Sequence, residues 1–258
     1  MLGTSLISDP WFYAASIPAL LLTSISKGSL GLGLGVVAVP LIALHLPVPV
    51  VVTLLLPLLC VTDLITLWQY RGEWSWPLLR IVIPAGLAGL GLGMLAIHHL
   101  SEAWLRLGVG VISIDFARRR WLASRQRERN DGAHVSTGSS IMWGTLSGFA
   151  SFMANAGEPA LAIFLLPHKL SKRCFAGTTA AFFAIINFAK LASFSMLGLF
   201  TRATLLGSLV VAPVAILGIG AGVWLNDRLD VRHFYQFAYV ILVVIGARMV
   251  YTSLRIIL

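Results

Sequence analysis

The chain has 258 residues, of which 58% are hydrophobic and only 11% are charged, whereas about a quarter of the residues in soluble globular domains are charged. This composition excludes a disordered chain, a collagen-like fibre and a disulfide-rich scaffold, since the only two cysteines, Cys60 and Cys174, both lie in apolar stretches. The sequence therefore predicts an all-α polytopic membrane protein. Its net charge of +9 is interpreted as the basic bias of cytoplasmic loops and not as nucleic-acid binding.

Apolar stretches follow one another along the chain, and a full membrane crossing needs about 20 apolar residues. The first half contains stretches near 10–27, 33–46, 48–69, 77–98 and 102–117. After a polar stretch, the second half contains stretches near 140–156, 158–168, 174–200, 204–225 and 233–254. The first two of each half are short and carry Gly and Pro, so each pair forms either two crossings or a broken, re-entrant hairpin.

The polar stretch divides the chain into three parts. We expect a first membrane repeat over 1–117, a basic cytoplasmic linker over 118–139 and a second membrane repeat over 140–258. The two halves share a weak internal repeat at an offset of 129, which matches Pro84, Gly89, Gly91 and Gly93 with Pro213, Gly218, Gly220 and Gly222. Each half makes five crossings if its short segments span the membrane and three if they form a re-entrant hairpin. The number of crossings is odd in both cases. The repeats are therefore expected to be inverted, as in many secondary transporters.

The positions of Lys and Arg predict the orientation of the chain in the membrane. When the linker is placed in the cytoplasm, thirteen basic residues fall on the cytoplasmic side and only Arg106, Arg202 and Arg255 on the other. Cytoplasmic loops carry such an excess. We therefore expect a multi-pass protein of the cytoplasmic (inner) membrane, with both termini on the non-cytoplasmic side.

Several ionisable residues lie within the apolar segments. They are Lys27, Asp63, Asp115, Glu158, Lys190 and Arg248. Because a charged side chain costs about 2.5–3.5 kcal/mol or more at the centre of a bilayer, such residues are candidates for function.

The break between the first two segments carries the first candidate site. Lys27 is followed there by Gly28, Ser29, Gly31 and Gly33. Free backbone N–H groups and the positive end of the next half-helix, placed beside a lysine, favour an anion site. The alternative is a lysine that extends to lipid phosphates at the cytoplasmic surface.

The equivalent break of the second half supplies Ser151 and Asn155 for hydrogen bonds and Gly157 for close approach of a ligand. Glu158 has three interpretations that the sequence leaves open. It caps the following helix, pairs with Lys27 across the pseudo-twofold axis, or carries a coupling proton.

Lys190 lies in the middle of a long apolar segment, and Asn187 shares its helix face because the two are three residues apart. Asp63 lies at a similar depth in the equivalent segment of the first half. A buried Asp63–Lys190 ion pair and a role in substrate binding both remain open, and Asp63 is a second candidate for a coupling proton. Thr178 is a weaker polar candidate.

The sequence lacks the motifs of several other functions. It contains no phosphate-binding loop, no Cys-x-x-Cys and no His pattern typical of a metal site. We therefore expect no bound metal or cofactor, no ATP hydrolysis and no enzymatic activity.

A set of motifs resembles the sulfite exporter TauE/SafE family over the whole chain except the linker. The residues that carry the resemblance are Val39-Pro40 after the first Gly-rich break, and then Gly144, Ser147, Gly148, Phe149, Gly157, Pro167 and Ala176-Gly177-Thr178. The chain departs from the family's runs of consecutive glycines, because Gly31, Gly33 and Gly35 alternate with leucine. The resemblance implies transport of sulfite, sulfonates or related small anions across the cytoplasmic membrane.

These observations together predict a secondary transporter of small anions that works by alternating access, with its site between the two Gly-rich broken hairpins and with proton coupling as an option. Its expected partners are a small anionic substrate and the lipid bilayer, with no nucleic acid, and a homodimer remains open. An anion channel is the first alternative, and an integral-membrane enzyme is the second.

Overall fold

The computed structural model describes residues 8–29, 35–97, 99–125, 137–226 and 232–257, and the regular structure within them is helical throughout. The first half forms α2 (Pro10–Ser29), α3 (Gly35–Ile42), α4 (Val48–Gln69), α5 (Trp76–Ala96) and α6 (Glu102–Arg125). The second half forms α7 (Thr137–Ala154), α8 (Glu158–Leu165), the 3-10 turn η1 (Leu166–His168), α9 (Lys172–Met196), α10 (Arg202–Asn226) and α11 (Arg232–Ile257). The expected all-helical fold is confirmed.

The structure changes the lengths of three predicted segments, which are those at 33–46, 158–168 and 102–117. α3 and α8 are short, with 8 residues each, whereas α2 and α7 have 20 and 18 residues. The helix expected at 102–117 continues to Arg125. A hydropathy criterion ends this segment at the first arginines, although Arg, Leu and Ala are strong helix formers and extend it.

Prolines and one serine set several helix starts. Pro49, Pro77 and Pro159 lie in the first turns of α4, α5 and α8, where a missing N–H costs little because it would have no partner within the helix. The hydroxyl of Ser171 accepts a hydrogen bond of 3.1 Å from the backbone N–H of Cys174, which caps α9.

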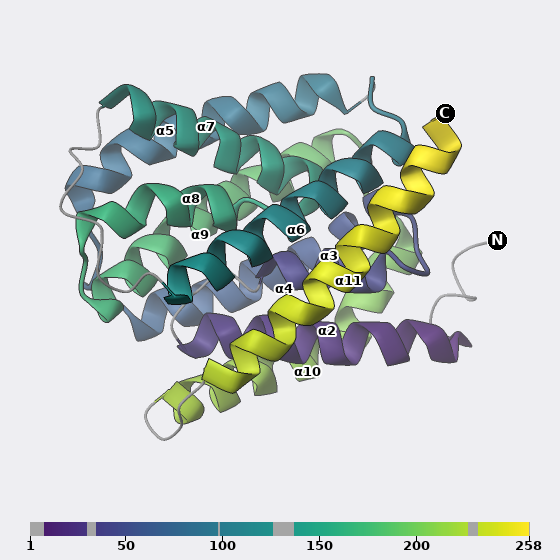
Figure 1. Ribbon diagram of the computed structural model, residues 1–258, viewed down its shortest axis with the longest axis horizontal. Helices are drawn as coiled ribbons and strands as arrows, with labels where there is room; N and C mark the ends of the chain where they lie inside the picture. The colour runs from purple at the N-terminus through teal and green to yellow at the C-terminus, as the bar shows by residue number, and fades with distance from the viewer. Residues whose placement is uncertain (1–7, 30–34, 98, 126–136, 227–231, 258) are drawn as a thin grey trace.

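The helices pack in pairs around a central pair. α5 packs along α7, α2 along α10 and α6 across α11, while α4 and α9 pack against each other. In Figure 1, α5 and α7 form one edge of the bundle and α2 and α10 the opposite edge. When the two halves are exchanged, the α5–α7 pair becomes the α10–α2 pair, and the α4–α9 and α6–α11 pairs map onto themselves. The inversion of the two repeats stays a prediction.

Glycines of the sequence repeat lie where the paired helices cross closely. A Cβ atom at Gly89 would overlap the backbone of Thr145 on α7, and one at Gly222 would overlap the backbone of Ile25 on α2. Gly91 has no atom within 4 Å of the position of a Cβ. Small residues let two helix backbones approach each other within a membrane, so Gly89 and Gly222 are required by packing.

We expect Gly89→Ala to lower the free energy of unfolding by about 1–3 kcal/mol, because the added methyl group forces α5 and α7 apart. Gly91→Ala is the matched control on the same helix. It is expected to be neutral or to stabilise by up to about 1 kcal/mol, the difference in helix propensity. Thermal unfolding of the purified protein in detergent measures both, and an equal fall in Tm for the two variants would contradict this packing.

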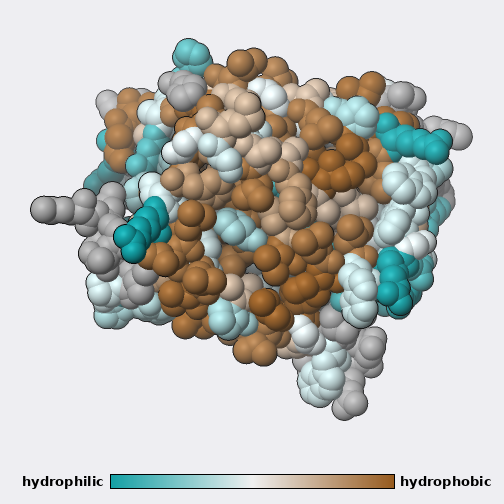
Figure 2. Space-filling view, turned by 180° about the vertical axis from the view of Figure 1, so that it is seen from behind, coloured by the Kyte–Doolittle hydropathy of each residue, from teal (hydrophilic) through white to brown (hydrophobic). Residues whose placement is uncertain are grey.

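The outer surface of the bundle is apolar. Within the described residues, five helical stretches are long and apolar enough to cross a membrane: Val48–Gln69, Trp76–Ala96, Lys172–Met196, Arg202–Gly222 and Tyr239–Ile257. Large apolar side chains such as Leu95 and Leu217 are more than 70% exposed, and Figure 2 shows that hydrophobic residues dominate one face of the molecule. α4 and α9 are the most buried of the five, so they carry the side chains of the molecule's centre.

Candidate functional site

Charged and amide side chains gather in the centre of the bundle, on α2, α4 and α9 and at the break between α7 and α8. Each of these residues is at most 8% exposed: Lys27, Asp63, Asn155, Glu158, Asn187 and Lys190. All six are candidates named from the sequence. Because burying charges without partners is costly, the partners of each one decide what the cluster can do.

Lys27 and Asp63 form a buried ion pair between α2 and α4. The Nζ atom of Lys27 lies 2.5 Å from Oδ1 of Asp63 and 3.4 Å from the hydroxyl of Thr62. The side-chain amide of Asn187 donates a 2.6 Å hydrogen bond to Oδ2 of Asp63. Each carboxylate oxygen thus has a donor, one from each half of the chain. Lys27 points into the bundle and not toward the lipid surface.

Lys190 is fully buried, and its hydrogen-bond partners among the described residues are neutral oxygen atoms. Its Nζ donates to the backbone carbonyl of Ser151 at 2.9 Å, to the Ser151 hydroxyl at 3.4 Å and to the side-chain oxygen of Asn155. Among the residues that the structure describes, no carboxylate forms an ion pair with Lys190. The Asp63–Lys190 pair that the sequence left open is not formed, because Lys27 occupies Asp63.

Asn155 connects the two halves at the end of α7. Its φ of 51° lies in the left-handed region, which Asn tolerates better than most residues. Its side-chain amide donates a 3.3 Å hydrogen bond to the backbone carbonyl of Val52 on α4, and its oxygen accepts from Lys190. The side chain therefore holds the central lysine of one half against the backbone of the other.

Two small cavities lie beside these groups. One of about 20 Å³ is lined by Lys27, Asp63, Glu158 and Thr179, and one of about 10 Å³ by Lys27, Asn155, Glu158 and Asn187, among others. Each has room for about one water molecule. Glu158 lines both.

Two polar atoms at these cavities lack partners. The side-chain oxygen of Asn187 and the hydroxyl of Thr179 are buried and have no hydrogen-bond partner among the described residues. A buried polar group without a partner costs about 1–3 kcal/mol. Each of these two atoms therefore indicates a place for a water molecule or a substrate atom.

Other predicted site residues have packing roles in this conformation. A Cβ at Gly28 would overlap the carbonyl of Ile219 on α10, and the Gly28 carbonyl accepts a 3.3 Å hydrogen bond from the hydroxyl of Tyr70. The carbonyl of Gly157 accepts a 2.7 Å hydrogen bond from the Ser147 hydroxyl.

The remaining predicted residues lie away from the cluster or outside the described part of the chain. Thr178 donates to the carbonyl of Cys174 at 2.6 Å and accepts from the N–H of Ser75 at 3.0 Å, so it ties α9 to the start of α5. The backbone of Ser29 ends α2. Gly31 and Gly33 lie outside the described residues.

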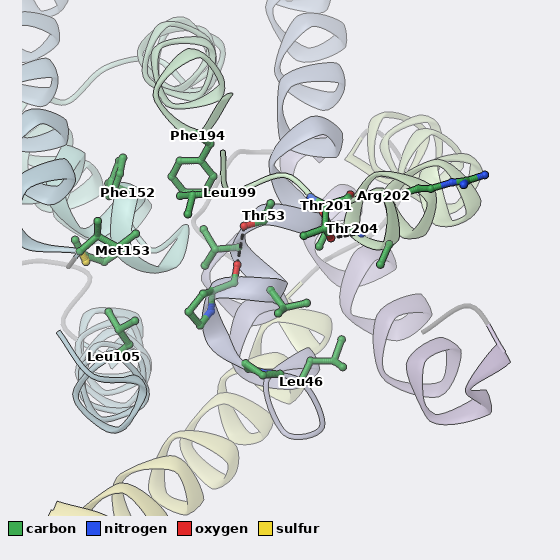
Figure 3. Close-up of a pocket in the computed structure, with 16 residues that line it drawn as sticks. Leu46, Thr53, Leu105, Phe152, Met153, Phe194, Leu199, Thr201, Arg202 and Thr204 are labelled. Carbon is green, nitrogen blue, oxygen red and sulfur yellow. Dashed lines mark hydrogen bonds between the residues drawn. The ribbon is translucent and has the colours of Figure 1, made fainter. Parts of the chain in front are cut away.

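A larger cavity of about 420 Å³ opens between the ends of α4, α7, α9 and α10, and we call it the vestibule. Figure 3 shows Phe152, Phe194 and Leu199 around it, with the side chain of Arg202 directed away from it. The rings of Phe152 and Phe194 pack edge to face with centroids 5.1 Å apart. Sequence patterns gave no sign of this cavity, because its lining residues have the same composition as a packed core.

Comparison with known proteins identifies the family. A family model described as sulfite exporter TauE/SafE matches residues 16–249. The chain belongs to this family. Its members are membrane transporters of sulfite and related anions, and with its five apolar helices the chain is a multi-pass membrane protein. Comparisons with curated proteins and with solved structures give no match.

Proposed function

We propose that this TauE/SafE member is a secondary transporter of small anions, such as sulfite, a sulfonate or a related organic anion, and that the anion binds at Lys190. The observation that carries the proposal is a fully buried lysine whose partners, within the part of the chain that the structure describes, are neutral oxygens. A buried ammonium without a counter-charge is costly. An anion of substrate size would supply that charge and form a charge-assisted hydrogen bond of about twice the usual strength.

Binding of the anion requires an exchange of partners. In this conformation the oxygens of Ser151 and Asn155 accept the hydrogen bonds of Lys190. Both residues lie at the break between α7 and α8. The cavities beside the cluster hold about one water molecule each. An anion therefore enters only when this break moves away from α9. That movement is the local step from which we infer alternating access.

The Lys27–Asp63 pair supports coupling to protons. A proton on Asp63 would remove the charge that holds Lys27, and the ammonium group would then be free to attract an anion that enters when the break between α7 and α8 moves. Glu158 lines a small cavity together with Lys27 and Asp63 and is the second proton carrier that we propose.

Asn155→Asp tests the anion site directly, because the substitution preserves shape and adds a carboxylate beside Lys190. We expect it to reduce sulfite uptake into proteoliposomes by more than tenfold, since the new charge occupies the lysine permanently. Asn155→Gly is the control, as it suits the left-handed backbone and adds no charge. We expect it to retain more uptake than Asn155→Asp. Equal uptake by Asn155→Asp and the unmodified protein would refute a site at Lys190.

A further inference from the structure

The lining of the vestibule is poorly suited to a bare inorganic anion. The hydroxyls of Thr53 and Thr204, its buried polar residues, donate to the backbone carbonyls of Pro49 and Thr201 at 2.7 and 2.9 Å. Most of its other lining side chains are apolar. A hydrated anion that entered it would lose water and gain few hydrogen bonds, which is unfavourable.

Only a thin wall separates the vestibule from Lys190. Phe152, in the wall, directly follows Ser151, which binds the lysine, and Phe194 lies one helical turn beyond Lys190 on α9. Val52, also in the wall, accepts the hydrogen bond of Asn155. The apolar cavity and the buried ammonium group are therefore adjacent parts of one structure.

We propose that the transporter binds organic anions with an unbranched apolar chain of about four to six carbons. The chain lies in the vestibule and the charged head reaches Lys190 once the end of α7, which carries Ser151 and Phe152, has moved away from α9. The inference rests on the proposed function and specifies its substrate class. A volume of about 420 Å³ lies within the range of 300–1,000 Å³ that is typical of cavities for organic ligands.

Two arginines lie near the mouth of the vestibule. Arg202 is exposed at the edge of the vestibule. Arg106 donates a 3.4 Å hydrogen bond to the carbonyl of Leu46, another lining residue, and forms an ion pair of 2.8 Å with Glu102. Basic residues at the mouth of a cavity raise the local concentration of anions. The charge at Lys190 thus selects an anion, while the lining of the vestibule selects its chain.

The test is direct binding of alkanesulfonates from methane- to hexanesulfonate to the purified protein in nanodiscs, measured by calorimetry. Burial of a methylene group is worth about 0.8 kcal/mol, so we expect Kd to fall about three- to fourfold for each added carbon. Leu199→Trp fills the vestibule and is expected to flatten this series. Leu217→Trp places the same side chain on the exposed face of α10 and is expected to leave the series as in the unmodified protein.

The outcomes separate the two proposals. A Kd that does not depend on chain length would overturn the vestibule as a chain site. An unchanged series in Leu199→Trp would overturn it as well, since the chains would then be entering lipid and not the cavity. Sulfite uptake into proteoliposomes is a separate measurement, and its absence would count against the proposed function whatever the chain-length series shows.

Discussion

Lys190→Met is expected to reduce anion uptake into proteoliposomes to the background level. The substitution keeps an unbranched side chain and removes the buried ammonium group, which we propose as the main contact of the substrate. Removing one partner of a buried, hydrogen-bonded charge pair costs about 2–5 kcal/mol, or about thirty- to several-thousandfold in affinity. The effect on folding is expected to be smaller, because an apolar side chain of similar volume often replaces a buried charge at little cost.

Lys172→Met is the matched control for this experiment. Lys172 is exposed in the first turn of the same helix, α9, so its removal changes the net charge equally without touching the centre. We expect its uptake to equal that of the unmodified protein. Normal saturable uptake by Lys190→Met would place the substrate elsewhere and would contradict the role assigned to Lys190.

Asp63→Asn is expected to have the largest effect on stability. It removes the counter-charge of Lys27, which is 8% exposed, and breaking a buried ion pair on one side costs about 3–5 kcal/mol. Glu73→Gln breaks the exposed Glu73–Arg173 pair and is expected to cost at most about 1 kcal/mol. Thermal unfolding in detergent compares the two. The double variant Lys27→Met/Asp63→Leu should recover most of the lost stability, because it removes both buried charges.

The single variant Asp63→Asn also tests the coupling of transport to protons. Asn at position 63 cannot take up a proton, so an imposed pH gradient should no longer drive uptake, while exchange of anions at equal pH continues. Glu158→Gln is the comparison that separates the two proposed proton carriers.

For the stability experiment, equal losses of Tm in Asp63→Asn and Glu73→Gln, or no recovery in the double variant, would contradict a buried ion pair that stabilises the fold.

Much of the fold could be predicted from the sequence because the bilayer imposes a simple rule on composition. A long apolar segment predicts a helix whatever its neighbours are. The ionisable residues Lys27, Asp63 and Lys190 could be recognised for the same reason, since charges are rare in such segments. Their partners could not be predicted. The depth of Asp63 in its segment suits either lysine, and only the rotation of α4 relative to α2 and α9 determines that it pairs with Lys27.

Residues of one type have different roles at different positions, and this limits what a pattern can predict. Gly28 was expected to bind an anion, and in this conformation it is the contact between α2 and the backbone of α10. Phe152 and Phe194 could not be distinguished from core residues by sequence, because the space beside them is created by helix ends that are far apart in the chain. The left-handed backbone of Asn155 likewise has no signal beyond the tolerance of Asn for it.

Exchange of labelled sulfite by the protein in liposomes at equal pH and without a membrane potential tests the central claim most directly. In a carrier, the binding site returns to the outer side of the membrane faster when it carries a bound anion than when it is empty. We therefore predict that unlabelled sulfite inside the liposomes accelerates the uptake of labelled sulfite, that this uptake saturates, and that Lys190→Met abolishes it. Uptake that rises linearly with concentration and does not respond to sulfite inside would contradict the account and would indicate a channel.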